Sequence, residues 1–177
     1  MIRIISGSHK GRRLQAPKDL PVRPTTDFAK EGLFNSMSQY MDFEQQTFLD
    51  LFVGIGNITF EMASRGCEDI TCVEVNFKCC SFIQQTVKQL EFNQVRVIKQ
   101  DAFDFIRKAK RKWSFIFCDP PYDLKETAQL PGLIFKHELL QPGGLLIIEH
   151  EERMKFQDVS HLVETRRYGK VNFSFFR

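Results

Sequence analysis

The stretch TFLDLFVGIGN, residues 47–57, decides the fold of this chain of 177 residues. It begins as an apolar, β-rich run of the kind found in a strand that is buried on both faces. It then turns through a G-x-G sequence at Gly54 and Gly56, and a helical pattern follows at residues 57–65. Glycines at such a turn let the backbone bend tightly and approach a ligand where a Cβ atom would clash. The stretch therefore predicts a strand, a ligand-binding loop and a helix of an α/β fold.

The same alternation of strand and helix continues toward the carboxyl end. Strands are expected at residues 69–75, 95–99, 114–119 and 144–149, and helices at 77–91, 102–110 and 127–140. Such alternation predicts a mainly parallel sheet covered by helices on both faces, whose ligand site lies beyond the carboxyl ends of the strands. Two further runs, residues 161–168 and 171–177, are separated by Gly169 and Lys170 and predict a terminal antiparallel hairpin.

Residues 1–24 follow a different pattern from the main domain, which is expected at residues 25–177. A short alternation of apolar and polar residues is followed by four turn-forming residues, Gly7, Gly11, Pro17 and Pro21. This pattern predicts a small β-hairpin that precedes the main fold. A helix is expected next, because apolar residues recur at helical spacing from Ala29 to Met41 with Asp27 favourably placed in the first turn.

Positive charge is concentrated at the amino end of the chain. Residues 1–30 hold seven basic residues, Arg3, Lys10, Arg12, Arg13, Lys18, Arg23 and Lys30, against two Asp. The remainder holds 18 basic and 20 acidic residues. This uneven distribution favours a polyanionic partner at the amino end, the alternative being a solvated hairpin that is merely basic.

Composition and cysteine spacing exclude several classes of protein. Hydrophobic residues make up 42% and charged residues 27% of the chain, as in ordinary soluble domains, and no apolar run is long enough to span a bilayer. No secretory signal is evident, so a cytoplasmic location is expected. The five cysteines are odd in number and form no C-x-x-C pair, which argues against a disulfide framework or a zinc site.

Two acids mark the carboxyl ends of the second and third strands of the main domain. Glu74 lies 18 residues after Gly56, where a carboxylate can accept hydrogen bonds from both hydroxyls of a ribose. Asp101 follows the third strand, where its side chain can accept from an adenine amino group. Either acid alone serves equally well as a favourable charge at a helix N-terminus. Together with the glycine loop they fit an adenosine ligand, while Thr59 in place of a third glycine disfavours a pyrophosphate cofactor.

The motif Asp119-Pro120-Pro121-Tyr122 directly follows the apolar strand SFIFC. Asp119 and Pro120 both precede a proline and are held extended, and the prolines offer no backbone N–H. The Asp119 carboxylate and the Pro120 carbonyl can therefore each accept a hydrogen bond from a flat NH2 group, while Tyr122 stacks on the ring that bears it. Holding both hydrogens directs the lone pair of an exocyclic amino nitrogen toward an electrophile. A base within a duplex cannot reach this loop, so the target must be unpaired or flipped.

With these motifs, the chain resembles the RsmD-type family of bacterial 16S ribosomal RNA guanine-N2 methyltransferases along nearly its whole length. The resemblance is carried by RIISGSHKGRRL, VRPTTDFAKEGLFN, FLDLFVGIGN, DPPY, PGGLLIIEHE and RRYGK. It implies a Rossmann-like class I methyltransferase fold, with a seven-stranded mostly parallel sheet, an antiparallel carboxyl-terminal hairpin and a small amino-terminal hairpin. It also implies S-adenosyl-L-methionine as methyl donor and ribosomal RNA, in the small subunit or its assembly intermediate, as partner. A monomer without a metal ion is expected.

The resemblance further implies a role for each matching residue. The methyl donor is expected at Asp50, Phe52, Gly54, Gly56, Glu74, Asp101 and Ala102. The guanine is expected at Asp119, Pro120, Pro121 and Tyr122, and the RNA at Arg3, Lys10, Arg12, Arg13, Arg23, Thr25 and Thr26. Ile55 and Asn57 stand where the family usually carries small residues, and their bulk is expected to affect the affinity for the donor.

Three other functions stay open. A DPPY methyltransferase acting on another RNA, or on adenine or cytosine of DNA, is the nearest, although 177 residues leave no inserted region for recognising a DNA target. An NAD-type oxidoreductase is disfavoured by the missing third glycine and by the DPPY motif. A non-catalytic RNA-binding module is disfavoured by the intact Asp119 and Tyr122.

Overall fold

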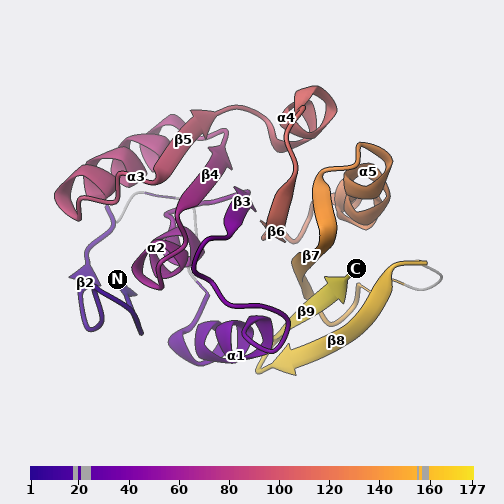
Figure 1. Ribbon diagram of the computed structural model, residues 1–177, viewed down its shortest axis with the longest axis horizontal. Helices are drawn as coiled ribbons and strands as arrows, with labels where there is room; N and C mark the ends of the chain where they lie inside the picture. The colour runs from indigo at the N-terminus through magenta and orange to yellow at the C-terminus, as the bar shows by residue number, and fades with distance from the viewer. Residues whose placement is uncertain (18–19, 21–24, 155, 157–159) are drawn as a thin grey trace.

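The computed structural model describes residues 1–17, 20, 25–154, 156 and 160–177. Its main body is a seven-stranded sheet in the order β5-β4-β3-β6-β7-β9-β8 (Figure 1). The parallel strands are β3 (Thr47–Leu51), β4 (Asp69–Glu74), β5 (Val95–Lys99), β6 (Trp113–Cys118) and β7 (Leu140–Glu151). β9 (Val171–Phe176) runs antiparallel between β7 and β8 (Leu162–Tyr168). The predicted parallel sheet and its antiparallel terminal hairpin are confirmed.

Each face of the sheet buries its own hydrophobic cluster, because side chains alternate between the two faces along every strand. On one face, Phe115 and Phe117 of β6 lie in a cluster with residues of α1 (Asp27–Met37), α2 (Asn57–Ser64) and α3 (Phe77–Gln89). On the other face, Ile116 and Cys118 lie in a cluster with residues of α4 (Ala102–Lys108) and α5 (Leu130–Lys136). All five cysteines are buried and unbridged. Within the described ranges, no helix is long and apolar enough to cross a membrane.

Proline explains two differences from the expected elements. The helix expected at residues 127–140 is divided into a 3-10 helix, η1 (Lys125–Gln129), and α5, which begins at Leu130 and has Pro131 in its first turn. Proline suits the first turn of a helix because its missing N–H would have no intrahelical partner there. β7 begins at Leu140, earlier than expected, and its register against β6 shifts after that residue. The shift accommodates Pro142, which has no N–H to donate.

The amino-terminal hairpin packs on the main body. β1 (Ile2–Arg3) pairs antiparallel with β2 (Arg13–Leu14), as predicted, and Ile2 and Leu14 are buried in the cluster that contains α1 and α2. Gly7 has a φ of +80°, and a Cβ atom there would lie 1.7 Å from the carbonyl oxygen of Ser64 at the end of α2. Glycine is therefore required at the point where the hairpin meets α2.

Candidate active site

Three carboxylates stand on neighbouring strands near the carboxyl ends of the parallel strands. Asp50 lies in β3, Asp119 directly follows β6, and Glu149 lies in β7. Asp50 and Glu149 are only 2% and 3% exposed, and each accepts a hydrogen bond from a threonine hydroxyl, Thr59 at 2.6 Å and Thr25 at 3.0 Å respectively. Strand pairing places the three acids side by side, because β6 lies between β3 and β7.

Burial and mutual repulsion keep these acids from ionising together. Burial raises the pKa of Asp50 and the pKa of Glu149 to about 7 each. Burial, followed by the charges of Glu149 and Asp50, raises the pKa of Asp119 well above its usual range. Neighbouring carboxylates in a poorly solvated site share protons or attract a cation. The site formed by Asp50, Asp119 and Glu149 is therefore suited to a positively charged ligand.

The G-x-G loop is fixed by Glu74, the acid at the end of β4. Glu74 Oε2 accepts from the backbone N–H of Gly54 at 2.8 Å, and Oε1 accepts from the N–H of Asn76 at 2.8 Å. Phe52, Gly54 and Gly56 all have positive φ values, of 63°, 58° and 79°. A Cβ atom at Gly56 would lie 2.9 Å from the ring of Phe60, so this turn requires glycine. A carboxylate has about four acceptor directions, so Glu74 can also accept from the hydroxyls of a ribose.

The predicted adenine-binding residues begin α4. Asp101 is the N-cap of that helix, and its side chain accepts from the N–H of Asp104 at 3.0 Å. The helix-capping alternative considered for Asp101 is thus present in the structure, and Ala102 beside it is buried. The next residue, Phe103, contacts Phe52 edge to face with ring centroids 6.0 Å apart. The start of α4 therefore packs directly against the loop that follows β3.

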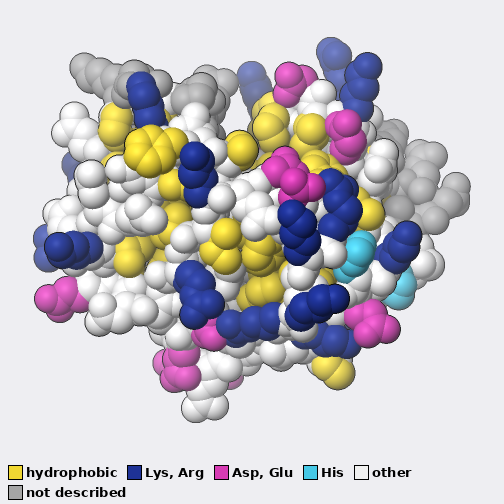
Figure 2. Space-filling model, turned by 90° about the horizontal axis from the view of Figure 1, so that it is seen from above, with side chains coloured by type: hydrophobic (Ala, Val, Ile, Leu, Met, Phe, Trp, Pro, Cys, Tyr) yellow, Lys and Arg dark blue, Asp and Glu magenta, His cyan; other side chains and the backbone are white. Residues whose placement is uncertain are grey.

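A pocket of about 330 Å³ lies beside the DPPY loop. Its lining residues are Pro120, Pro121, Tyr122, Thr127, Glu149, His150, Glu151, Arg153 and Met154. Asp119 immediately precedes this lining, and its N–H donates to the carbonyl of Leu51 at 3.3 Å, which ties the loop to the end of β3. The volume is at the lower end of the range for small-molecule sites. Figure 2 shows the molecule from above relative to Figure 1, from the side where α4 and α5 are drawn, and on this face Lys and Arg side chains lie around patches of hydrophobic ones.

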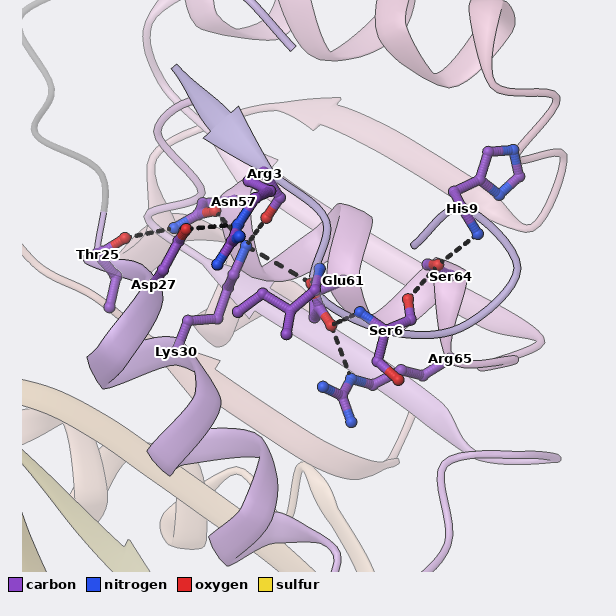
Figure 3. Close-up of polar contacts among 11 residues, drawn as sticks. Arg3, Ser6, His9, Thr25, Asp27, Lys30, Asn57, Glu61, Ser64 and Arg65 are labelled. Carbon is purple, nitrogen blue, oxygen red and sulfur yellow. Dashed lines mark hydrogen bonds and ion pairs between the residues drawn. The ribbon is translucent and has the colours of Figure 1, made fainter. Parts of the chain in front are cut away.

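Thr25 connects the pocket to the interior behind it. Its hydroxyl donates to Glu149 Oε2 at 3.0 Å, and its carbonyl accepts from Asn57 Nδ2 at 2.9 Å. Asn57 Oδ1 accepts in turn from Lys30 Nζ at 2.9 Å (Figure 3). A continuous line of hydrogen bonds therefore runs from an acid of the pocket to a lysine of α1. Asn57, whose bulk was expected to affect the affinity for the donor, is only 7% exposed. Its side-chain amide is occupied by the hydrogen bonds to Thr25 and Lys30.

Lys30 and Glu61 form a buried ion pair beneath the hairpin (Figure 3). Both side chains are fully buried, with Nζ and Oε2 3.5 Å apart. Lys30 also donates to the carbonyl of Arg3 at 2.5 Å, and Glu61 accepts from the N–H groups of Ile5 and Ser6 at 2.7 Å and 3.0 Å. Burial lowers the pKa of Lys30, and the charge of Glu61 opposes that shift. The pair thus satisfies three backbone groups of the hairpin, those of Arg3, Ile5 and Ser6.

The predicted RNA-contact residues differ in their exposure and in their partners. Lys10, Arg12 and Arg13 are exposed on the hairpin, whereas Arg23 lies outside the described residues, as does Lys18. Arg3 is half exposed and forms an ion pair with Asp27 at 2.7 Å. Thr26 caps α1 by accepting from the N–H of Ala29 at 3.3 Å, and Thr25 faces Glu149.

The sequence interpretation was wrong about Lys30 and missed Glu149. Lys30 was counted in the basic segment, yet it is fully buried and its charge is directed inward to Glu61. Glu149 ends the apolar run GLLII in the same way that Asp119 ends SFIFC. An acid at the carboxyl end of a buried strand was therefore the signal that could have identified Glu149.

A family model and curated relatives match almost the whole chain. The sequence model of the family Conserved hypothetical protein 95 matches residues 2–177. YlbH of Bacillus subtilis (strain 168), which its name proposes as an rRNA methyltransferase, is 36% identical over 183 residues, covering 99% of this chain and 98% of that protein. Ribosomal RNA small subunit methyltransferase D of Buchnera aphidicola subsp. Baizongia pistaciae (strain Bp) is 31% identical over 153 residues, covering 86% and 78%.

A solved structure shares the fold at low sequence identity. It is an RNA methyltransferase from Salinibacter ruber in complex with S-adenosyl-L-homocysteine, with a TM-score of 0.67 and 14% identity, covering 87% of this chain and 92% of that one. At this identity the likeness concerns the fold alone. The predicted methyltransferase fold is confirmed.

Proposed function

Because the chain belongs to the family Conserved hypothetical protein 95, the RsmD-type methyltransferases, we propose that it methylates the exocyclic N2 of a guanine in 16S ribosomal RNA. It is a methyltransferase that acts on ribosomal RNA, and its methyl donor is S-adenosyl-L-methionine. The observation that carries the assignment to an exocyclic amino nitrogen is the acid Asp119, with the Pro120 carbonyl after it, at a pocket of about 330 Å³, while the choice of guanine rests on the family. Two acceptors at that place suit the two hydrogens of an amino group.

The residues beyond β3 and β4 fit the methyl donor. When bound, S-adenosyl-L-methionine supplies a methyl group on a cationic sulfonium and also carries an ammonium group. The pKa values of Asp50 and Glu149, both raised to about 7, show negative charge that burial disfavours and that a cation would stabilise. We assign the methionine end to Asp50, Gly54 and Gly56 and the ribose to Glu74. Asp101 and Ala102 are assigned to the adenine, and the Phe52 ring to the cation.

Asp119, Pro120 and Tyr122 prepare the guanine for attack. The Asp119 carboxylate and the Pro120 carbonyl accept hydrogen bonds from the two hydrogens of N2, and the Tyr122 ring stacks on the base. Pro121 holds Pro120 extended and offers no competing N–H. The N2 lone pair, otherwise delocalised into the ring, is then directed at the methyl carbon. The bound donor would supply the methyl carbon and would leave as a neutral thioether. The proton that N2 then carries is lost to Asp119, which is within reach because it already holds that hydrogen.

The exposed basic side chains of the hairpin are proposed to hold the RNA backbone. Lys10, Arg12 and Arg13 supply positive charge, and residues 1–24 would act as the RNA-contacting unit of a catalytic domain at residues 25–177. We propose that Arg3 also contacts the RNA, and that Arg23, Thr25 and Thr26, which belong to the family motif VRPTT, act near the junction of donor and substrate. We further propose that the protein works as a monomer in the cytoplasm, on the small subunit or its assembly intermediate.

Methyl transfer to small ribosomal subunits tests this proposal directly. Subunits that lack the modification would be incubated with labelled S-adenosyl-L-methionine, and the RNA digested for nucleoside analysis. We expect labelled N2-methylguanosine in 16S RNA. Label in adenine, in cytosine or only in added DNA would contradict the proposed target, and no label in any nucleic acid would contradict the activity.

A further inference from the structure

We infer that Glu149 selects guanine by accepting a hydrogen bond from its N1–H, next to the amino group that Asp119 holds. This inference rests on the proposed function, because it concerns how the same site distinguishes guanine from the other bases. Glu149 lines the pocket beside the DPPY loop together with Pro120 and Tyr122, and it is 3% exposed. An acid so buried at a ligand pocket requires a partner, since an isolated charge there is unfavourable.

Strand pairing sets Glu149 beside Asp119. β6 and β7 are parallel neighbours, and Cys118 pairs with Ile148, so the next residues on the two strands are Asp119 and Glu149. The charge of Glu149 also contributes to the raised pKa of Asp119. A flat molecule held by Asp119 therefore presents its adjoining edge to Glu149.

Thr25 fixes the orientation of the Glu149 carboxylate. The threonine hydroxyl donates to Oε2 at 3.0 Å, which assigns one of the two oxygens to the protein. The Thr25 backbone is itself held by Asn57 at 2.9 Å, and Asn57 by the buried Lys30 at 2.9 Å. With one oxygen committed and its donor held in place, the other oxygen, Oε1, is the acceptor for a ligand on the pocket side.

The pattern of acceptors matches one base. Beside the cationic methyl donor, which favours the charged form of nearby acids, Asp119 and Glu149 would both be ionised, and an ionised carboxylate, like the Pro120 carbonyl, only accepts hydrogen bonds. The three groups then offer acceptors and no donors. Guanine presents three adjacent hydrogens, two on N2 and one on N1. The amino groups of adenine and cytosine stand beside a ring nitrogen that is an acceptor, and this nitrogen would face the Glu149 oxygen. Two facing acceptors leave both unsatisfied, and sites that require a particular hydrogen bond reject analogues that lack it.

The test uses 2,6-diaminopurine, which keeps the 2-amino group of guanine but has an acceptor at N1 in place of N1–H. Small subunits would be assembled with guanine or 2,6-diaminopurine at the methylated position, which wild-type enzyme and nucleoside analysis identify first. For wild-type protein, we expect kcat/KM to fall by roughly 100-fold or more with 2,6-diaminopurine. In Glu149→Gln, the amide can turn its NH2 toward N1, so the preference for guanine should shrink to less than roughly tenfold.

The ratio between the two substrates distinguishes base reading from a structural role. A carboxylate that only anchors Thr25 would lower transfer to both substrates equally in Glu149→Gln and leave the ratio unchanged, which would overturn the inference. Equal wild-type rates on both substrates would also overturn it while leaving the methyltransferase assignment intact. Failure on guanine itself would instead refute the proposed function. Glu152→Gln, an exposed acid that pairs with Arg167 outside the pocket lining, is the matched control and should keep the wild-type ratio. Thermal unfolding and donor affinity would verify that each variant is folded.

Discussion

Replacing Lys30 by methionine should destabilise the protein strongly, although a lysine on a basic segment looks expendable. Lys30 and Glu61 are both fully buried, so the change leaves a carboxylate without its cation and also removes donors to the Arg3 carbonyl and Asn57. Breaking a buried pair by removing one partner costs about 3–5 kcal/mol. Arg65, whose Nε lies 2.9 Å from Glu61 Oε1, still compensates part of the charge, so we expect the lower end, about 3 kcal/mol.

Equilibrium unfolding in urea measures this loss, with Arg111→Met as the matched control. Arg111 forms an ion pair with Asp69 at 2.6 Å, but both side chains are more than 40% exposed, and such surface pairs contribute only about 0–1 kcal/mol. The double variant Lys30→Met with Glu61→Gln should recover part of the loss, because it removes the uncompensated charge. A cost for Lys30→Met no larger than that of Arg111→Met would refute the reasoning that the pair fixes the hairpin to α2.

Three further predictions concern activity and pH. Asp119→Ala should lower kcat by about 10²–10³-fold while the Kd for S-adenosyl-L-methionine, measured by calorimetry, stays nearly constant; retained activity would contradict the role of Asp119. Changing Arg12 and Arg13 together to Glu should weaken RNA binding and flatten its dependence on salt in filter-binding titrations, and an unchanged salt slope would remove the hairpin from the contact surface. The pKa values of Asp50 and Glu149 are raised in the folded protein to about 7, so folded protein retains protons that the unfolded chain releases. Without donor, the Tm should therefore fall as pH rises from about 4 through 7. The affinity for the cationic donor should rise over the same interval as Asp50 ionises, and a flat donor affinity would show that Asp50 does not face the donor.

The elements of the fold were predictable because β3, β4, β6 and the second half of β7 are buried and mainly apolar, whereas the edge strand β5 is only half-buried. All five parallel strands end at or beside a recognisable turn or acid. The exceptions have local causes. Pro131 restarts the helix after β6, and Pro142 lies in the register shift of β7. Neither outcome follows from hydrophobic periodicity, because proline acts through a missing N–H and not through polarity.

The candidate site was predictable where one short segment holds the whole motif, and not where distant segments meet. Asp119 to Tyr122 and the glycine loop are contiguous in the sequence. The contact between Thr25 and Glu149 joins residues 124 positions apart, and nothing local to either residue indicates the other. Burial of Lys30 is likewise a tertiary property, since a single lysine in a basic segment has the same sequence signature whether it contacts solvent or Glu61.

The strand order on one side of the sheet has a consequence for synthesis of the chain. β8 is made before β9, yet β9 takes the place beside β7. For a time the nascent chain therefore carries β7 with an open edge and a finished strand that is not its final neighbour. β8 alternates half-buried and exposed residues and includes Glu164, Arg166 and Arg167, whereas Phe173, Phe175 and Phe176 of β9 are fully buried. Charged strands pair poorly with an apolar interior and protect sheet edges. The composition of β8 thus disfavours its pairing beside β7, and in the folded protein it makes β8 a charged border against other chains.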